Sequence, residues 1–161
     1  MKIQKICVLG GTGFVGRHLV ARLANRGYQV KVLTRHPQRH RGIEVLPNTK
    51  LIEAGVHDPT VLLENFSGCD AVVNLVGVLH EYSGQSFRAV HAELPGKVVE
   101  ACRAAGVKRL LHMSALHADA AKGPSQYLFT KGEGEQVVMR AEGLAVTCFK
   151  PSIIFGPDDN F

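Results

Sequence analysis

The sequence predicts an α/β fold, in which one parallel β-sheet carries helices on both faces. Short apolar segments alternate along the chain with segments whose apolar residues recur every three or four positions, a pattern typical of parallel sheets. Residues 71–76 are apolar on both faces, as expected for a strand at the centre of such a sheet. A glycine-rich turn joins the first apolar segment to the first amphipathic one.

Six strands are expected, at residues 5–9, 29–34, 50–54, 71–76, 109–114 and 145–150. Helices are expected at about residues 14–26, 59–66, 87–105 and 125–141, and a basic loop follows the second strand. Asp58 and Pro59 mark the start of the second helix, because aspartate caps helix N-termini and proline fits the first helical position. This spacing predicts a doubly wound sheet of the Rossmann type, with three α/β/α layers and the strand order 3-2-1-4-5-6.

The composition is that of an ordinary globular domain. Of the 161 residues, 45% are hydrophobic and 20% are charged, so we expect one domain over residues 1–161. No apolar run approaches the roughly eighteen residues of a membrane-spanning helix, and the first strand begins too early to leave room for a signal peptide. The four cysteines are far apart in apolar segments, which favours a reducing compartment. A cytoplasmic location is therefore expected, with attachment to a membrane through a partner as the alternative.

Two classes of binding site are not favoured. Eight histidines are present, but none has a ligand-like spacing with further metal-binding residues, so no metal site is expected. Much of the net charge of +5 lies at residues 34–41, in a short cluster without interleaved aromatic residues. Nucleic-acid binding is therefore not expected either.

The turn at residues 10–16 reads G-G-T-G-F-V-G and contains the pattern G-x-G-x-x-G. Glycine lets a pyrophosphate approach the backbone, and the following helix offers its free N–H groups to the phosphates. A strand before the turn and a helix after it favour a dinucleotide site, whereas the alternative is a turn whose glycines serve packing alone. The turn residues predicted to bind a cofactor are Gly10, Thr12, Gly13, Phe14, Val15 and Gly16.

Ligands of doubly wound sheets bind at the carboxyl ends of the strands, where Arg35, Asn74, Ser114 and Pro151 are expected to join the glycine turn. Arg35 stands where many NAD-binding folds have an acidic residue that binds the ribose. A guanidinium instead pairs with a 2′-phosphate, and Arg39 follows closely. NADP(H) is therefore favoured as the cofactor and NAD(H) is the alternative. A solvated basic loop without a ligand is the other interpretation.

Tyr127 and Lys131 are four residues apart and share one face of the helix expected at 125–141. A nearby ammonium stabilises a phenolate and lowers its pKa, so that the phenol can transfer a proton near neutral pH. Ser114 ends the fifth strand, where its hydroxyl could orient a substrate carbonyl. These three residues are the predicted catalytic group.

These motifs resemble those of the short-chain dehydrogenase/reductase superfamily over essentially the whole chain. Residues 10–16 look like the glycine motif of its extended and atypical branches, and residues 74–77, N-L-V-G, are similar to the turn after its fourth strand. Ser114, Tyr127 and Lys131 match its catalytic serine, tyrosine and lysine. The resemblance implies that Tyr127 is the acid/base and that Lys131 also binds the nicotinamide ribose. It extends the predicted cofactor contacts to Asn74, Val76, Gly77, Pro151 and Ile153.

A closer resemblance is carried by residues 112–116, H-M-S-A-L, and by residues 150–161. They look like the atypical group that contains the NADPH-binding accessory subunit of respiratory complex I and epimerase-like relatives. The chain departs from the family pattern at Gly55, where an aspartate often meets the adenine, and at His91, where asparagine is common. It also ends at Phe161, whereas extended and atypical members continue into a substrate lid, so the substrate portion is expected to be absent.

The leading interpretation is an NADP(H)-dependent oxidoreductase that transfers hydride between the nicotinamide and a small-molecule carbonyl or alcohol. The first alternative is a non-catalytic nucleotide-binding structural or assembly subunit of the complex I accessory type. The second is a nucleoside-diphosphate-sugar epimerase or dehydratase. A homo-oligomer and association with a respiratory complex are both left open.

Two smaller expectations concern the helices. Pro95 lies four residues after His91, so it leaves the His91 carbonyl without its usual donor. A water held there could lead toward Lys131; the alternative is a helix that starts or kinks near Pro95. Glu133 and Glu135 are expected to face solvent.

Overall fold

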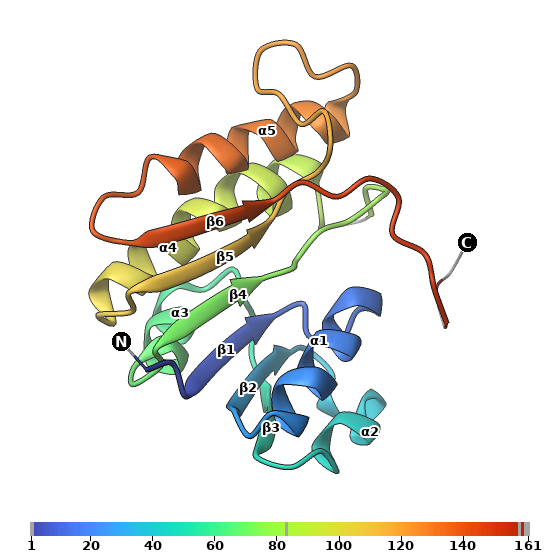
Figure 1. The fold of residues 1–161 in the computed structure, drawn as a ribbon. Helices are drawn as coiled ribbons and strands as arrows, with labels where there is room; N and C mark the ends of the chain where they lie inside the picture. The colour runs from blue at the N-terminus through green and yellow to red at the C-terminus, as the bar shows by residue number, and fades with distance from the viewer. Residues whose placement is uncertain (1, 83, 158, 160–161) are drawn as a thin grey trace.

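A single six-stranded parallel sheet forms the middle layer of the molecule (Figure 1). The computed structural model describes residues 2–82, 84–157 and 159. The strands are β1 (Lys5–Leu9), β2 (Gln29–Thr34), β3 (Thr49–Glu53), β4 (Ala71–Asn74), β5 (Arg109–Met113) and β6 (Ala145–Phe149). Their order across the sheet is β3-β2-β1-β4-β5-β6, which confirms the predicted doubly wound Rossmann topology.

The helices cover both faces of this sheet (Figure 1). One face carries α1 (Phe14–Asn25) and the short α2 (Arg41–Glu44), and the other carries α3 (Pro59–Phe66), α4 (Leu94–Ala104) and α5 (Gln126–Met139). The predicted cap of α3 is confirmed, because the Asp58 carboxylate accepts a 2.9 Å hydrogen bond from the Thr60 amide. The expected loop after β2 contains a 3-10 turn, η1 (Pro37–Arg39), as well as α2, so it is more ordered than the sequence predicted.

Two hydrophobic cores lie on opposite faces of the sheet, because successive side chains of a strand point to opposite sides. Along β1, Cys7 and Leu9 contribute to the core beneath α3 and α4, whereas Ile6 and Val8 contribute to the core beneath α1. β4 is buried over its whole length, which confirms the burial on both faces expected for the strand at residues 71–76, and β1 is buried from its second residue onward. Because all six strands run parallel, their carboxyl ends lie along one edge of this packed sheet.

The segment before α4 is wider than an ordinary α-helix. Residues Arg88–Glu93 form a π-helical turn, η2, in which the Leu94 amide donates to the Ala89 carbonyl five residues earlier. Pro95 follows directly and has no amide proton for a carbonyl four residues before it. The expected continuous helix at 87–105 is therefore two elements, and the widened turn lies at the site-facing end.

Two glycines allow α5 to approach its neighbours closely. A Cβ on Gly134 would overlap the His91 carbonyl oxygen, and one on Gly132 would overlap the backbone at Asp119 and Ala120. The His91 carbonyl thus lies against α5 at Gly134 and not beside the Lys131 ammonium. This placement does not fit the water relay suggested by the sequence and favours the alternative of a helix distorted near Pro95.

Candidate functional site

A cleft of about 550 Å³ opens at the carboxyl edge of the sheet. Its floor is the glycine turn between β1 and α1, and its walls are the ends of β4 and β5, the first turns of α5 and the segment after β6. The topology brings these pieces together from across the whole sequence. This is the location that the strand order predicted for a ligand.

The glycine turn is shaped by two close backbone approaches. Gly10 has φ +73°, and a Cβ there would lie 2.9 Å from the Leu75 carbonyl carbon. A Cβ on Gly16 would overlap the Gly10 carbonyl oxygen, so only glycine permits this packing of α1 on the turn. The N-cap residue Gly13 makes no side-chain capping bond, and the first turn of α1 has no acidic residue. The helix therefore presents amide protons and its positive dipole end at the cleft, which suits a phosphate.

Most of the predicted cofactor-binding residues lie around this cleft. The lining includes Gly10, Gly13, Phe14, Val15, Gly16, Gly77, Lys131, Pro151 and Ile153. Thr12 instead lines a neighbouring cavity of about 350 Å³ beside Arg17 and His18. Asn74 is the buried last residue of β4, and Val76 packs partly buried against the core beneath α3 and α4. Arg35 and Arg39 are exposed beyond the end of β2.

Asn74 organises the backbone that lines the cleft. It is buried; its side-chain oxygen accepts a 3.1 Å hydrogen bond from the Val76 amide, and its amide group lies 3.3 Å from His112 Nδ1. Since the oxygen accepts, the amide nitrogen donates to an unprotonated Nδ1 of His112. Burial, with smaller contributions from Lys131 and His91, lowers the pKa of His112 to about 3, so this histidine is neutral.

Lys131 is a nearly fully buried cation, 4% exposed, at the wall of the cleft. Its ammonium donates a 2.5 Å hydrogen bond to the Met113 carbonyl at the end of β5. Burial lowers its pKa from 10.5 to about 8, although Cys148 and Glu135 oppose this shift. The ammonium is thus held at the base of the site and is mostly protonated at neutral pH.

Tyr127 is half-buried on the same wall, one turn before Lys131. Its ring meets the His91 ring edge to face, with centroids 5.1 Å apart, and the Phe87 ring at 5.9 Å. Burial raises the pKa of its phenol, contrary to the lowering expected from the nearby lysine. The cause of the rise is desolvation of the phenolate by burial.

Ser114 lies in the cleft wall, but its hydroxyl proton is already used. It donates a 2.6 Å hydrogen bond to Glu135, whose other carboxylate oxygen lies 2.8 Å from the Lys150 ammonium. Because an ionised carboxylate only accepts, Ser114 can offer the cleft no more than its lone pairs. The expectation that Glu133 and Glu135 face solvent is wrong: Glu135 bridges two strand ends, and Glu133 pairs with Arg88 at 3.7 Å.

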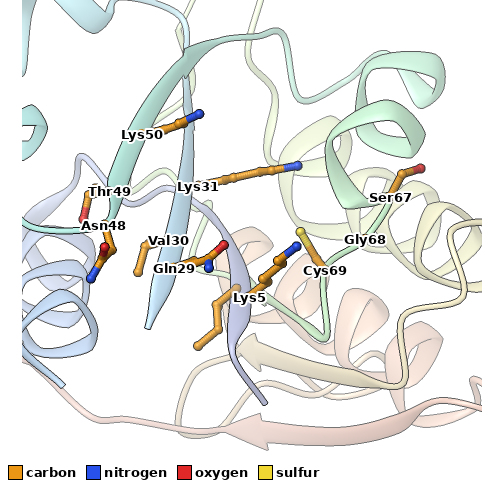
Figure 2. Close-up of a pocket in the computed structure, with 11 residues that line it drawn as sticks. Lys5, Gln29, Val30, Lys31, Asn48, Thr49, Lys50, Ser67, Gly68 and Cys69 are labelled. Atoms are coloured by element: carbon orange, nitrogen blue, oxygen red, sulfur yellow. The ribbon is translucent and has the colours of Figure 1, made fainter. Parts of the chain in front are cut away.

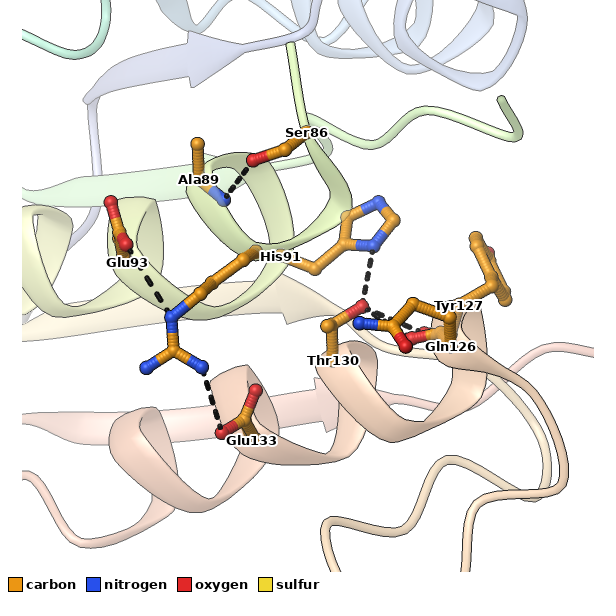
Figure 3. Close-up of polar contacts among 9 residues, drawn as sticks. Ser86, Ala89, His91, Glu93, Gln126, Tyr127, Thr130 and Glu133 are labelled. Carbon is orange, nitrogen blue, oxygen red and sulfur yellow. Dashed lines mark hydrogen bonds and ion pairs between the residues drawn. The ribbon is translucent and has the colours of Figure 1, made fainter. Parts of the chain in front are cut away.

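His91 is a site residue whose role the sequence did not predict. Its buried ring bridges the Val78 amide of the cleft wall, at 3.1 Å, and the Thr130 hydroxyl of α5, at 3.2 Å. Figure 3 shows the contact with Thr130. Burial, with a smaller effect of Lys131, lowers its pKa to about 4. A histidine in an otherwise apolar helical face was the available signal, but the backbone partner across the cleft could not be read from spacing.

A second cavity, of about 380 Å³, lies at the opposite, amino edge of the sheet (Figure 2). Lys5, Lys31 and Lys50 extend over it from three neighbouring strands. Lys31 donates to the Asn65 carbonyl in the last turn of α3, a helix end that attracts cations. This contact explains the position of Lys31 without a ligand. The cavity is also remote from the glycine turn.

Other site classes find no support in the described part of the chain. Among residues 2–82, 84–157 and 159, no group of three histidine, cysteine or acidic side chains is placed to hold a metal ion. Within the same residues, none of the helices combines the length and apolar character that crossing a bilayer requires.

Comparisons with known proteins agree with the geometry of the cleft. Residues 10–159 match the family described as NAD(P)H-binding. The chain is 32% identical over 155 residues to the mitochondrial NADH-ubiquinone oxidoreductase 40 kDa subunit of Neurospora crassa, covering 94% of this chain and 41% of that protein. It is 31% identical over 159 residues to a ceramide reductase of Caulobacter vibrioides, covering 96% and 47%. The chain thus spans less than half the length of these two relatives.

The fold is shared with solved nucleotide-binding enzymes. UDP-glucuronic acid 4-epimerase of Bacillus cereus, in complex with NAD, superimposes with a TM-score of 0.79 at 20% identity, covering 96% of this chain and 58% of that one. At this identity the likeness concerns the fold alone. With the family match, the strand order and the glycine turn all in agreement, this chain belongs to the NAD(P)H-binding family of the extended short-chain dehydrogenase/reductase type.

Proposed function

We propose that this protein is an NADP(H)-dependent oxidoreductase that reduces a carbonyl group of a small-molecule substrate. The observation that carries the proposal is one cleft that joins the glycine turn to Tyr127 and Lys131. The diphosphate would lie on the amide groups at the start of α1, and Lys131 would bind the nicotinamide ribose. A bound nicotinamide supplies the hydride.

The proton side of the reaction falls to Tyr127. Because burial raises the pKa of its phenol, Tyr127 stays protonated at neutral pH and can donate to the oxygen of a substrate carbonyl. Lys131 would stabilise the resulting phenolate and bind the ribose in place of part of its contact with Met113. Ser114 would not orient the substrate carbonyl, because its hydroxyl donates to Glu135 and a carbonyl has no proton to donate to the serine oxygen.

The test of catalysis is Tyr127→Phe. This change removes the hydroxyl and keeps the ring packed on His91 and Phe87. Oxidation of NADPH, followed at 340 nm across a panel of aldehydes and ketones, should fall at least about 100-fold, the usual worth of a general acid. An activity equal to that of the wild type would remove Tyr127 from the mechanism.

The choice of NADP(H) rests on Arg35 and Arg39, which are exposed at the carboxyl end of β2. A Cβ on Gly55, at the end of β3, would meet no atom within 4 Å, which leaves open space near the expected adenine. Arg35→Asp should weaken NADPH binding at least about tenfold more than NADH binding, because a forked ion pair with the 2′-phosphate is lost. Equal losses for the two nucleotides, measured by calorimetry, would refute the preference.

A second function is favoured by two observations. Ser114 cannot donate a hydrogen bond into the cleft, and one relative is named as an NADH-ubiquinone oxidoreductase subunit. The chain would then bind NADPH as a structural subunit that associates with a respiratory complex. Residues 1–161 would serve as the nucleotide-binding domain in either case, with the substrate-binding part supplied outside them. This function would be favoured if the protein binds NADPH and melts at a higher temperature with NADPH than without it, but reduces no carbonyl compound.

A further inference from the structure

We infer that His91 is a positioning residue, which ties the Val78 wall of the cleft to the helix that carries Tyr127 and Lys131. The inference deepens the proposed nucleotide site and rests on it. His91 is 2% exposed and lies at the junction of three segments: the loop after β4, the π-helical turn η2, and α5. It contacts the site through both ring nitrogens and through its ring face.

The hydrogen bonds determine which ring nitrogen carries the proton. The Val78 amide can only donate, so Nε2 of His91 must accept at 3.1 Å and is unprotonated. In the neutral ring the proton is then on Nδ1, which donates to the Thr130 hydroxyl at 3.2 Å. Thr130 in turn donates toward the Gln126 or Tyr127 carbonyl, at 2.9 and 3.1 Å (Figure 3). Every polar atom along this path has a partner, and a second ring proton would have none.

The aromatic contacts add the phenol to the same unit. The His91 ring stacks on Phe87 at 5.5 Å with an interplanar angle of 19°, and it meets the Tyr127 ring at 87°. The orientation of the imidazole is fixed at both nitrogens, so it restricts the tyrosine ring packed against it. Phe87 closes the stack from the start of the same helical segment.

The π-helical turn explains how the ring reaches the cleft. An extra residue per turn displaces the backbone, and Pro95 prevents a return to regular α-helical bonding at this point. Gly134 lets α5 lie directly against the His91 carbonyl, so the helix carrying the phenol sits close to the histidine. A Cβ on Gly77 would lie 3.7 Å from His91 Nε2 and 3.9 Å from Lys131 Nζ, so both groups lie close to Gly77 in the cleft wall.

Four variants separate the two arms of the imidazole. His91→Gln places an amide oxygen near the position of Nε2 and can still accept from Val78. His91→Asn places an amide nitrogen near Nδ1, keeps a donor for Thr130 and loses the Val78 bond. His91→Phe loses both bonds, and Thr130→Val removes the other partner without touching the cleft wall.

We expect His91→Asn and His91→Phe to weaken NADPH binding about tenfold, because the unpaired Val78 amide releases the wall, whereas His91→Gln and Thr130→Val should stay within about threefold. Losses of affinity that follow thermal stability alone, whichever arm is removed, would overturn the inference.

Two measurements on the nucleotide-free protein are independent of the proposed function. By ¹⁵N NMR, His91 should carry its proton on Nδ1, and the Val78 amide should be protected from hydrogen exchange in the wild type and in His91→Gln but not in His91→Asn. A proton on Nε2, or equal exchange in all variants, would refute the arrangement even if NADPH binds; failure of the wild type to bind nucleotide would refute the proposed function instead.

Discussion

Replacing Lys131 by methionine should stabilise the protein at neutral pH while it removes a residue of the site. The ammonium is buried and its pKa is lowered from 10.5 to about 8. At pH 7 the native state therefore carries a cation that is less well solvated than in the unfolded chain. The difference between 10.5 and about 8, at about 1.4 kcal/mol for each pKa unit, corresponds to roughly 3 kcal/mol. Methionine has a similar shape, fills the same space and carries no charge.

The sign of the pH dependence follows from proton binding. The unfolded lysine holds its proton to higher pH than the native one, so the free energy of unfolding rises with pH between about 8 and 10.5 and falls as pH drops toward 8 and below. About 2 kcal/mol of this change should fall between pH 7 and pH 9.5. Lys131→Met should lack it, so the stability difference between the variant and the wild type should shrink by that amount over this range.

Urea denaturation at a series of pH values measures this difference, because other titrating groups cancel between the two proteins. Lys108→Met is the matched control, since Lys108 is an exposed lysine just before β5. Parallel profiles for the wild type and Lys131→Met would show that Lys131 is not a destabilised buried cation. Loss of NADPH binding in Lys131→Met, together with higher stability, would mark a site that sacrifices stability for function.

Two further substitutions test the construction of the cleft. Gly16→Ala should lower the free energy of unfolding by about 1–3 kcal/mol and abolish NADPH binding, because the new methyl group would overlap the Gly10 carbonyl oxygen. Gly42→Ala is the control, since a Cβ there meets nothing within 4 Å. Wild-type stability and NADPH binding in Gly16→Ala would show that the turn adjusts to the methyl group without cost. Glu135→Leu should lower the melting temperature by several degrees, equivalent to about 1–3 kcal/mol, since it leaves the buried Ser114 hydroxyl without its acceptor. Glu142→Leu, at an exposed position, should have little effect, and similar melting temperatures for the two leucine variants would argue against a structural role of the Ser114–Glu135 bond.

Local patterns predicted the elements that depend on neighbouring residues. The alternation of apolar segments predicted all six strands, with β1 and β2 correct to the residue, and Asp58-Pro59 predicted the start of α3. Glycine spacing predicted the turn, because the absence of a Cβ is a property of the residue itself. The π-helical turn and the short α2 were not predicted, since their patterns resemble an ordinary helix and a basic loop.

The sequence by itself thus determined the fold class, the strand order and the edge at which a nucleotide would bind, because periodicity and turn chemistry act over a few residues. Only the tertiary structure decided the state of the side chains in that cleft. Glu135 lies 21 residues from Ser114, and Thr130 lies 39 residues from His91, yet these partners decide which group donates. Burial set the pKa values of Tyr127 and Lys131, and burial depends on how α5 packs on η2 and β5, which spacing along one chain does not contain.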